Sequence, residues 1–254
     1  MSEHVSLNML DAATAEILID RPERHNAMTI PMYEALLASI DECRRNADVR
    51  CIVLRGAGGK SFVSGTDIGY FTDFHDGRQG VAYEALVERV IDAVERIAVP
   101  TIAVIDGWAV GGGLALATAC DFRLCSEGSK FGAPIAKTLS NTLSSRNLAR
   151  LHAAFGVPRV KKMLLLADFL SAQDALACGY VYEICAKDAL GDMALALAQR
   201  LGALSQVTQH AVKESLRRIV VEQRLDDEDL IESVYGSAAF RAGVAAFTAG
   251  SNQR

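Results

Sequence analysis

The sequence contains little that would suit it to bind nucleic acid or to cross a membrane. Its 254 residues include 26 lysines and arginines against 31 aspartates and glutamates, a net charge of −5, and no basic run stands out. An acidic chain without a basic patch is not expected to bind nucleic acid. The longest uncharged stretch near the middle, residues 107–120, is too short and too rich in glycine to span a bilayer. We therefore expect neither a nucleic-acid partner nor a membrane segment.

The cysteines lack the spacing of metal-ligand pairs. Six are scattered along the chain without a C-x-x-C pair, and four of them have apolar neighbours on at least one side. This pattern is typical of reduced core residues, and we predict no metal site. Residues 1–4 have neither a basic start nor an apolar segment, so we expect no signal peptide. These features favour a soluble, cytoplasmic protein.

The sequence does have an ordinary globular composition, half apolar and 22% charged, with enough length for a sizeable core. Apolar alternation and short apolar runs predict strands, and a 3.6-residue apolar period predicts helices. Strands are expected at residues 5–10, 15–20, 51–54, 101–105 and 122–125, and helices at 29–46, 83–97 and 114–119. Such alternation indicates parallel strands with helical crossovers. After residue 144 the pattern is mostly helical, with helices expected at 144–155, 158–167, 171–177, 188–204, 207–221 and 226–235.

Two glycine-bearing turns carry the chemistry that follows from the residues alone. Residues 64–67 read Ser-Gly-Thr-Asp and residues 111–113 are all glycine; each turn follows a buried strand segment and precedes helical sequence. Backbone N–H groups at the start of a helix are unpaired and carry the positive end of its dipole. Two such turns from neighbouring parallel strands can direct two N–H groups at one oxygen and stabilise an oxyanion. The alternative is that both are merely tight turns.

Four ordered motifs resemble the crotonase (enoyl-CoA hydratase/isomerase) superfamily over nearly the whole length. Residues 21–28 (RPERHNAM) are similar to R-P-x-x-x-N-A-[LM], and residues 62–68 (FVSGTDI) are similar to F-x-[AS]-G-A-D-[LI]. Residues 106–113 (DGWAVGGG) resemble N-G-x-A-x-G-G-G. The segments CDFR at 120–123 and KFGAP at 130–134 resemble the C-D-x-R … F-x-x-P stretch.

The resemblance implies a fold, a partner and an oligomer. The fold would be α/β, with a crotonase-type ββα spiral core over residues 1–195 and a C-terminal helical trimerisation region over residues 196–254. The substrate would be an acyl-CoA thioester, and no cofactor is implied beyond the coenzyme A that the substrate carries. The protein would form a homotrimer or a dimer of trimers.

The resemblance also assigns site residues. The oxyanion-hole N–H groups would belong to Thr66 and Gly112, which would polarise the thioester carbonyl and hold the enolate that forms when an α-proton leaves. Thr66 stands where alanine is usual in the family, a change that leaves the backbone donor in place. Asp67 is interpreted as a structural cap rather than a base. Substrate or coenzyme A binding is implied for Arg24, Ala27, Ser64, Gly65, Asp67, Ile68, Gly111, Pro134, Ile135 and Asn141.

Three further positions depart from the family pattern. Hydration of an enoyl thioester needs one group to deprotonate water and another to protonate the α-carbon. Where hydratases of the family carry two glutamates, this chain has Ala115 and Ile135, and neither can accept a proton. Asn141 lies near the position of an aspartate in isomerase- or dehalogenase-type members, and it is not a base. The titratable residues that could replace the glutamates are Asp73, His75, Asp76 and His152.

Two functions of different classes remain open. The first is an acyl-CoA enzyme of the enoyl-CoA hydratase/isomerase group with an oxyanion hole and an unidentified acid–base partner. Within that class, isomerisation, decarboxylation and thioester hydrolysis compete with hydration because some of them need fewer protein acids. The second is an acyl-CoA-binding or scaffold protein that has kept the fold and lost turnover. The absent glutamates favour the second function, and the two intact glycine turns favour the first.

Overall fold

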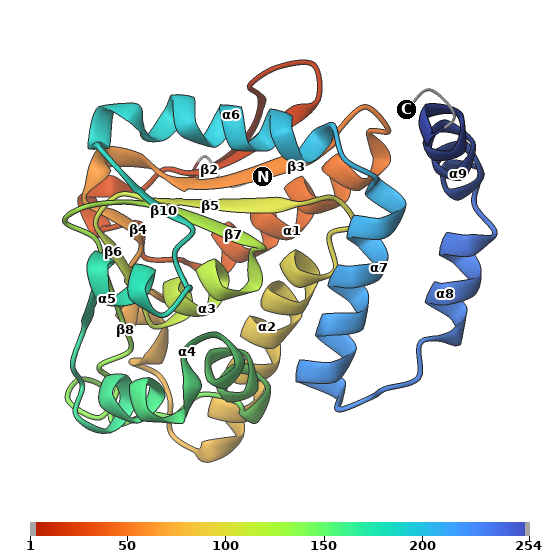
Figure 1. Cartoon of the computed structure of the whole chain (residues 1–254). Helices are drawn as coiled ribbons and strands as arrows, with labels where there is room; N and C mark the ends of the chain where they lie inside the picture. Colours follow the sequence, from red (N-terminus) through yellow and green to blue (C-terminus); the bar gives the residue numbers. More distant parts are fainter. Residues whose placement is uncertain (1–3, 252–254) are drawn as a thin grey trace.

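The computed structural model describes residues 4–251, in which layered strands are enclosed by helices (Figure 1). Residues 1–3, on which the expectation about a signal peptide mainly rests, lie outside the described residues, as do residues 252–254. Within residues 4–251, no helix combines the length and the apolar character needed to cross a membrane.

The larger sheet has six strands in the order β1-β2-β3-β5-β7-β10. Only β1 is antiparallel to its neighbour, and the other pairs are parallel, as the spacing of strands and helices predicts. The strands are β1 (Val5–Met9), β2 (Thr14–Ile19), β3 (Cys51–Gly56), β5 (Thr101–Ile105), β7 (Phe122–Ser126) and β10 (Glu183–Cys185). The central strand β3 is buried on both faces, because Ile52 and Leu54 enter one core while Cys51 and Val53 enter another.

A second sheet of four short strands was not predicted from the sequence. Its order is β4-β6-β8-β9, and β4, β6 and β8 run parallel. The strands are β4 (Ser61–Val63), β6 (Trp108–Val110), β8 (Lys130–Gly132) and β9 (Leu170–Ser171). The sequence predicts a loop over residues 107–113, and this is wrong because Trp108–Val110 within it form β6. Three residues are too few for an apolar period to show in the sequence.

The two sheets are built by three successive turns of a ββα spiral. Each turn adds one strand to the larger sheet, one to the smaller sheet, and then a helix. The turns are β3-β4 with α2 (Gly77–Glu95), β5-β6 with α3 (Gly112–Ala119), and β7-β8 with α4 (Ser145–Leu165). The α/β fold with a ββα spiral core is thus confirmed. The two helices predicted at 144–155 and 158–167 are the two halves of α4, which breaks at Gly156 (φ 71°).

Helices cover both faces of the larger sheet (Figure 1). On one face, α6 (Leu190–Gly202) contributes Leu190, Leu197 and Leu201 to the smaller core. On the other face, α1 (Ile30–Arg45), α2 and α3 contribute to the larger core. The remaining short helices are α5 (Ala172–Ala177) and the 3₁₀ segments Pro22–Arg24, Ala57–Gly59, Ile68–Phe71 and Lys187–Ala189.

The cysteines are free thiols that pack inside the molecule, as predicted. Five are buried and Cys178 is half-buried. Burial raises the pKa of Cys51 to about 12 and that of Cys125 to about 12, so both thiols stay protonated at neutral pH. Such groups act as small apolar core residues rather than as nucleophiles.

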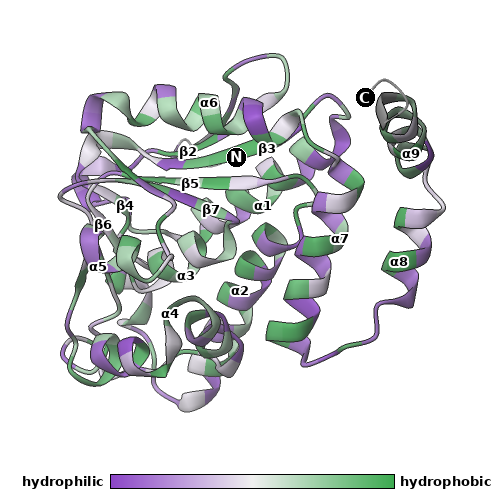
Figure 2. Cartoon of the chain, in the orientation of Figure 1, coloured by the Kyte–Doolittle hydropathy of each residue, from purple (hydrophilic) through white to green (hydrophobic). Residues whose placement is uncertain are grey.

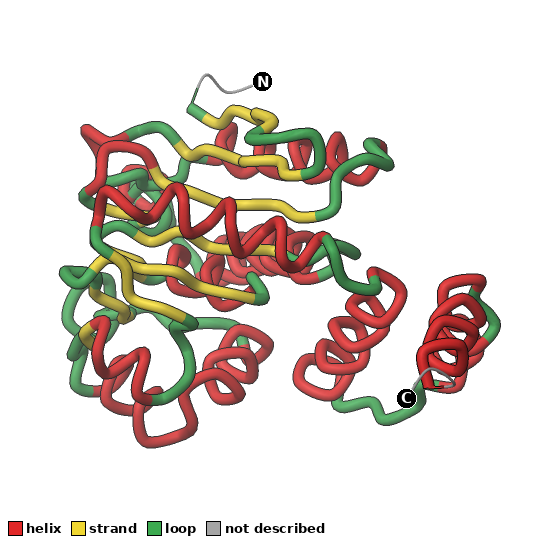
Figure 3. Tube along the Cα trace, turned by 45° about the horizontal axis from the view of Figure 1, so that its top comes forward, coloured by secondary structure: helices red, strands yellow, loops and turns green. Residues whose placement is uncertain are grey.

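The C-terminal region is helical and partly set off from the rest of the chain. It consists of α7 (Gln206–Arg217), a π-helical turn (Arg218–Glu222), α8 (Glu228–Tyr235) and α9 (Ala238–Ser251). Both views show α8 and α9 standing apart from the sheets (Figures 1 and 3). Hydrophobic residues recur along α7 and α8 (Figure 2), and those exposed in this region include Leu216, Ile231, Tyr235, Phe240 and Phe247. Apolar exposure on this scale is typical of a surface that another chain covers.

Candidate active site

The smaller sheet positions the candidate site. Because β4, β6 and β8 are parallel, their carboxyl ends meet at one edge, and the segments that follow them lie together there. Residues 64–66, 110–112 and 134–135 from these segments line a cavity of about 170 Å³. Residues of α2 and of the segment 138–147 close its other sides. The segments that follow β4, β6 and β8 therefore form one pocket together with α2.

Nine of the twelve residues assigned to the site from the sequence line this cavity. They are Ser64, Gly65, Thr66, Ile68, Gly111, Gly112, Pro134, Ile135 and Asn141. The other three, Arg24, Ala27 and Asp67, are on neighbouring segments outside its lining. Arg24 is exposed, and the carbonyl of Ala27 accepts a hydrogen bond from Arg21 Nη1 at 3.0 Å.

Asp67 caps the 3₁₀ helix that follows the first glycine turn. Its Oδ1 accepts a hydrogen bond from the backbone N–H of Gly69 at 3.0 Å, and its Oδ2 pairs with Arg21 Nη1 at 2.6 Å. The hydrogen bond from Arg21 holds the pKa of this carboxyl below its usual range. Asp67 is thus a charged tether between two loops, in agreement with its interpretation as a cap.

Each glycine of the triplet has a different structural role. Gly111 has φ 55° and ψ −117°, a conformation that other residues rarely adopt. Gly112 is the first residue of α3, where the backbone N–H has no partner within the helix. At Gly113 a Cβ atom would lie 1.9 Å from the carbonyl oxygen of Val63, so only glycine lets α3 approach β4 this closely. The helix α3 therefore begins within the triplet, at Gly112, and not after it as predicted.

Thr66 and Gly112, from the two glycine turns, both line the cavity. A Cβ atom placed on Gly65 would lie 3.6 Å from the backbone nitrogen of Gly112. The backbones of the two glycine turns are therefore close to each other. Within residues 4–251, neither amide donates a hydrogen bond to another group of the chain. Two unpaired donors, one of them at the positive end of α3, can stabilise a negative charge that develops on a bound oxygen.

The two positions for which the resemblance implies glutamate are apolar in this cavity. Ala115 and Ile135 both line the cavity, and Ala115 is buried. The replacements suggested from the sequence do not compensate, because Asp73, His75, Asp76 and His152 are all absent from the cavity lining. Asp76 instead caps α2 through the backbone N–H groups of its first turn.

The sequence analysis missed a carboxylate on α2, Glu84. It lines the cavity, and its Oε2 accepts a hydrogen bond from the backbone N–H of Ser144 at 2.7 Å. Burial raises the pKa of this carboxyl, and the nearby Glu88 raises it further. The sequence feature that could have identified Glu84 is its position on the helix, beside the apolar stripe that contains Tyr83 and Val87.

A chain of three hydroxyl groups runs beside the cavity. The side-chain oxygen of Thr66 lies 2.7 Å from the hydroxyl of Tyr33 and 2.7 Å from that of Tyr83. Burial raises the pKa of both phenols, that of Tyr83 to about 12, so both keep their protons at neutral pH. The hydroxyl that threonine adds at this position therefore joins two helices, α1 and α2.

The change Thr66→Ala is expected to destabilise the protein by about 1–3 kcal/mol, because it leaves two buried phenol hydroxyls without this partner. Denaturant unfolding measures the loss. As a control, Thr72→Ala removes an exposed hydroxyl bonded to the carbonyl of Gly69 and should change stability less. Equal stability of the two variants would contradict a structural role for the chain of hydroxyls.

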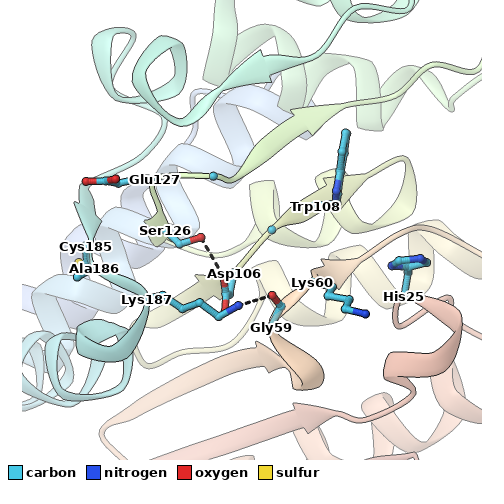
Figure 4. Close-up of a pocket in the computed structure, with 12 residues that line it drawn as sticks. His25, Gly59, Lys60, Asp106, Trp108, Ser126, Glu127, Cys185, Ala186 and Lys187 are labelled. Carbon is cyan, nitrogen blue, oxygen red and sulfur yellow. Dashed lines mark hydrogen bonds and ion pairs between the residues drawn. The ribbon is translucent and has the colours of Figure 1, made fainter.

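A larger cavity, of about 620 Å³, lies elsewhere, beside segments that follow β5 and β7 of the six-stranded sheet. Figure 4 shows several of its polar side chains engaged with one another. Asp106 accepts a hydrogen bond from Ser126 at 2.9 Å and pairs with Lys187 Nζ at 3.1 Å, and Lys187 also donates to the carbonyl of Gly59. No residue assigned to the site from the sequence lines this cavity. The smaller cavity, with its unpaired amides, is therefore the better candidate for chemistry.

Comparison with known proteins places these features in context. The family model for enoyl-CoA hydratase/isomerase matches residues 10–251. The chain is 34% identical over 197 residues to the probable enoyl-CoA hydratase EchA17 of Mycobacterium tuberculosis, covering 77% of this chain and 74% of that protein. It is 31% identical over 216 residues to (E)-benzylidenesuccinyl-CoA hydratase of Thauera aromatica, covering 79% and 77%. The structure of an enoyl-CoA hydratase/carnithine racemase from Magnetospirillum magneticum matches with a TM-score of 0.88 and 29% identity, covering 98% and 94%.

Proposed function

Because the chain belongs to the enoyl-CoA hydratase/isomerase family of the crotonase superfamily, we propose that it is an enzyme that acts on acyl-CoA thioesters through an enolate. The observation that carries this proposal is the pair of unpaired amides, Thr66 and Gly112, on the wall of one cavity. The thioester carbonyl oxygen would accept both N–H groups. Each such donor contributes about 3–4 kcal/mol to the stability of an oxyanion.

The proposed chemistry is proton transfer at the α-carbon of the acyl group. When an α-proton leaves, the electron pair moves onto the carbonyl oxygen, where the two amides and the start of α3 hold the charge. The apolar residues Ala115 and Ile135 line this cavity and supply no base. An isomerase, a decarboxylase or a thioester hydrolase fits these residues better than a hydratase with two glutamates. Hydration is the activity named for the relatives above.

Coenzyme A binding and assembly complete the proposal. Arg24, which is exposed at the end of the 3₁₀ segment Pro22–Arg24, and Ala27 would lie along coenzyme A. Coenzyme A would enter as part of the substrate and not as a separate cofactor. Residues 196–254 would form the trimerisation region beside the core of residues 1–195. The apolar residues that α8 and α9 expose support burial against a second copy. A homotrimer or a dimer of trimers and a cytoplasmic location remain predictions.

A second function is an acyl-CoA-binding or scaffold protein without turnover. The observation that favours it is that both usual glutamate positions are apolar in the cavity. Such a protein would keep the two amides as a binding site for the thioester oxygen and would not move a proton.

One experiment separates the two functions. The purified protein is incubated with crotonyl-CoA and a panel of other acyl-CoA thioesters, and the loss of the conjugated thioester absorbance and the products are followed. Calorimetric titration with coenzyme A runs alongside. We expect binding together with turnover well above the uncatalysed rate. Tight binding without turnover on any thioester would favour the scaffold, and absence of binding would contradict both functions.

A further inference from the structure

Glu84 is the one carboxylate among the described residues that line the cavity. It lies on α2, on the wall that also carries Tyr83 and Val87, and shares the cavity with the amides of Thr66 and Gly112. It is half-buried, so its carboxyl group is neither sealed in the core nor fully in solvent. A proton acceptor for a bound thioester must reach this cavity, and Glu84 meets that condition.

The partners of Glu84 differ from those of two other glutamates on the same helix. Arg150 on α4 pairs with Glu88 at 2.8 Å and with Glu95 at 3.0 Å. Among the described residues, no cation forms an ion pair with Glu84, which instead accepts its hydrogen bond from the backbone N–H of Ser144. Of the three glutamates on α2, only Glu84 therefore has no ion-pair partner among the described residues, and it is the one that lines the cavity.

The surroundings of Glu84 also suit its protonation. Burial and the charge of Glu88 raise its pKa, while the hydrogen bond from Ser144 opposes them. The negative charge of Glu84 adds to the raised pKa of the Tyr33 and Tyr83 phenols, which stay neutral. A carboxyl that lines a cavity and has a raised pKa holds a proton more readily than an exposed glutamate, and a general acid–base group must both accept and return one.

We propose that Glu84 is the catalytic acid–base residue of this cavity and that the substrates are acyl-CoA thioesters carrying a removable α-proton. The proposal rests on the proposed enzyme function. In the step, the C–H bond at the α-carbon breaks and an O–H bond forms on Glu84, while the electron pair moves to the thioester oxygen held by Thr66 and Gly112. The proton then returns to the α-carbon, or to the γ-carbon of a 3-enoyl thioester with a shift of the double bond. No oxidant, reductant or water is consumed.

A purely structural role for Glu84 makes a different prediction, which allows a clean test. In that role the side chain only ties α2 to Ser144 at the start of α4. Glutamine at residue 84 can still accept the hydrogen bond from Ser144 through its amide oxygen, but it cannot take up a proton. Glu84→Gln thus removes the base and keeps the tether, whereas Glu84→Ala removes both.

The test uses 3-butenoyl-CoA in D₂O with the full-length protein. Deuterium uptake is followed by mass spectrometry, conversion to crotonyl-CoA by absorbance, and binding by calorimetry. We expect Glu84→Gln to bind the thioester and to slow deuterium uptake by about 100-fold or more. Glu34→Gln, an exposed glutamate on α1, is the matched control and should exchange at the wild-type rate. In Glu84→Ala, added formate should restore part of the exchange by acting as an external carboxylate.

Each outcome decides the inference. Loss of exchange in Glu84→Gln with retained binding, together with rescue of Glu84→Ala by formate, supports it. Exchange at the wild-type rate in Glu84→Gln overturns it and leaves Glu84 as a tether. Wild-type protein that binds 3-butenoyl-CoA without exchange also overturns it and favours the scaffold function. Wild-type protein that binds no acyl-CoA contradicts the proposed function itself. If Glu84→Gln does not fold, failure of formate to rescue Glu84→Ala overturns the inference.

Discussion

Replacing Gly112 with proline is expected to lower kcat/KM for an acyl-CoA substrate by about 100- to 1000-fold, the effect of removing one oxyanion donor. Proline has no backbone N–H, so the variant lacks one of the two amides on the cavity wall. Its fixed φ is tolerated at the first position of a helix, which is where Gly112 lies in α3. The fold should therefore survive while the activity is lost. Steady-state kinetics and circular dichroism check the two parts.

The matched control is Gly112→Ala, which keeps the N–H group. Its Cβ atom would lie 3.4 Å from the hydroxyl of Tyr33 and 3.7 Å from the Cα of Gly65, which are ordinary contact distances. We expect the alanine variant to keep most of the activity. A folded proline variant that turns over at the wild-type rate would contradict the assignment of the Gly112 amide as an oxyanion donor.

The parts of the fold that could be predicted from the sequence are those whose burial is continuous or periodic. Residues 101–105 form a strand buried at every position, and the predicted range matches β5. The short strands β4, β6 and β8 have three residues each, and their residues form strands only because neighbouring turns of the spiral place them side by side. Pairing of this kind is a tertiary effect that a local pattern does not carry.

The same distinction explains what could be predicted of the site. A backbone donor needs glycine for close approach, so Gly111 and Gly112 form a motif that the order of residues alone reveals. No sequence motif identifies Glu84, because glutamates are common on amphipathic helices. Its function depends on which loops pack against its face of the helix. The contact with Ser144 links residues 60 positions apart. Long-range contacts of this kind are available only once the chain is folded.

The hydroxyl chain is a third case. The sequence identifies Thr66 as a departure from the usual alanine, and the consequence lies in residues that no motif includes. Tyr33 on α1 precedes Thr66 in the sequence and Tyr83 on α2 follows it, and both hydroxyls contact the Thr66 side chain. A departure within a family motif therefore indicates where compensating residues should be sought, and the folded chain identifies them.

Replacing Arg150 with alanine is expected to destabilise the protein by about 3–5 kcal/mol, the range found when one member of a buried ion pair is removed. The guanidinium is 3% exposed and bridges Glu88 and Glu95, which are 14% and 17% exposed. Without it, two poorly solvated carboxylates of α2 lose the cation that contacts both of them. Denaturant unfolding measures the loss. Arg44→Ala, which breaks an exposed pair with Asp41, is the control and should cost about 1 kcal/mol or less.

The pH dependence of the Arg150→Ala variant tests the cause of that loss. Burial already raises the pKa of Glu95, and Arg150 opposes this shift. Removing Arg150 should raise the pKa of Glu95 further above its unfolded value, so the folded variant binds more protons than the unfolded chain, and its stability should fall as pH rises. The stability deficit relative to wild type should therefore shrink as pH is lowered toward the unfolded pKa of glutamate. A deficit that does not change with pH would indicate lost packing of the arginine side chain rather than uncompensated charge.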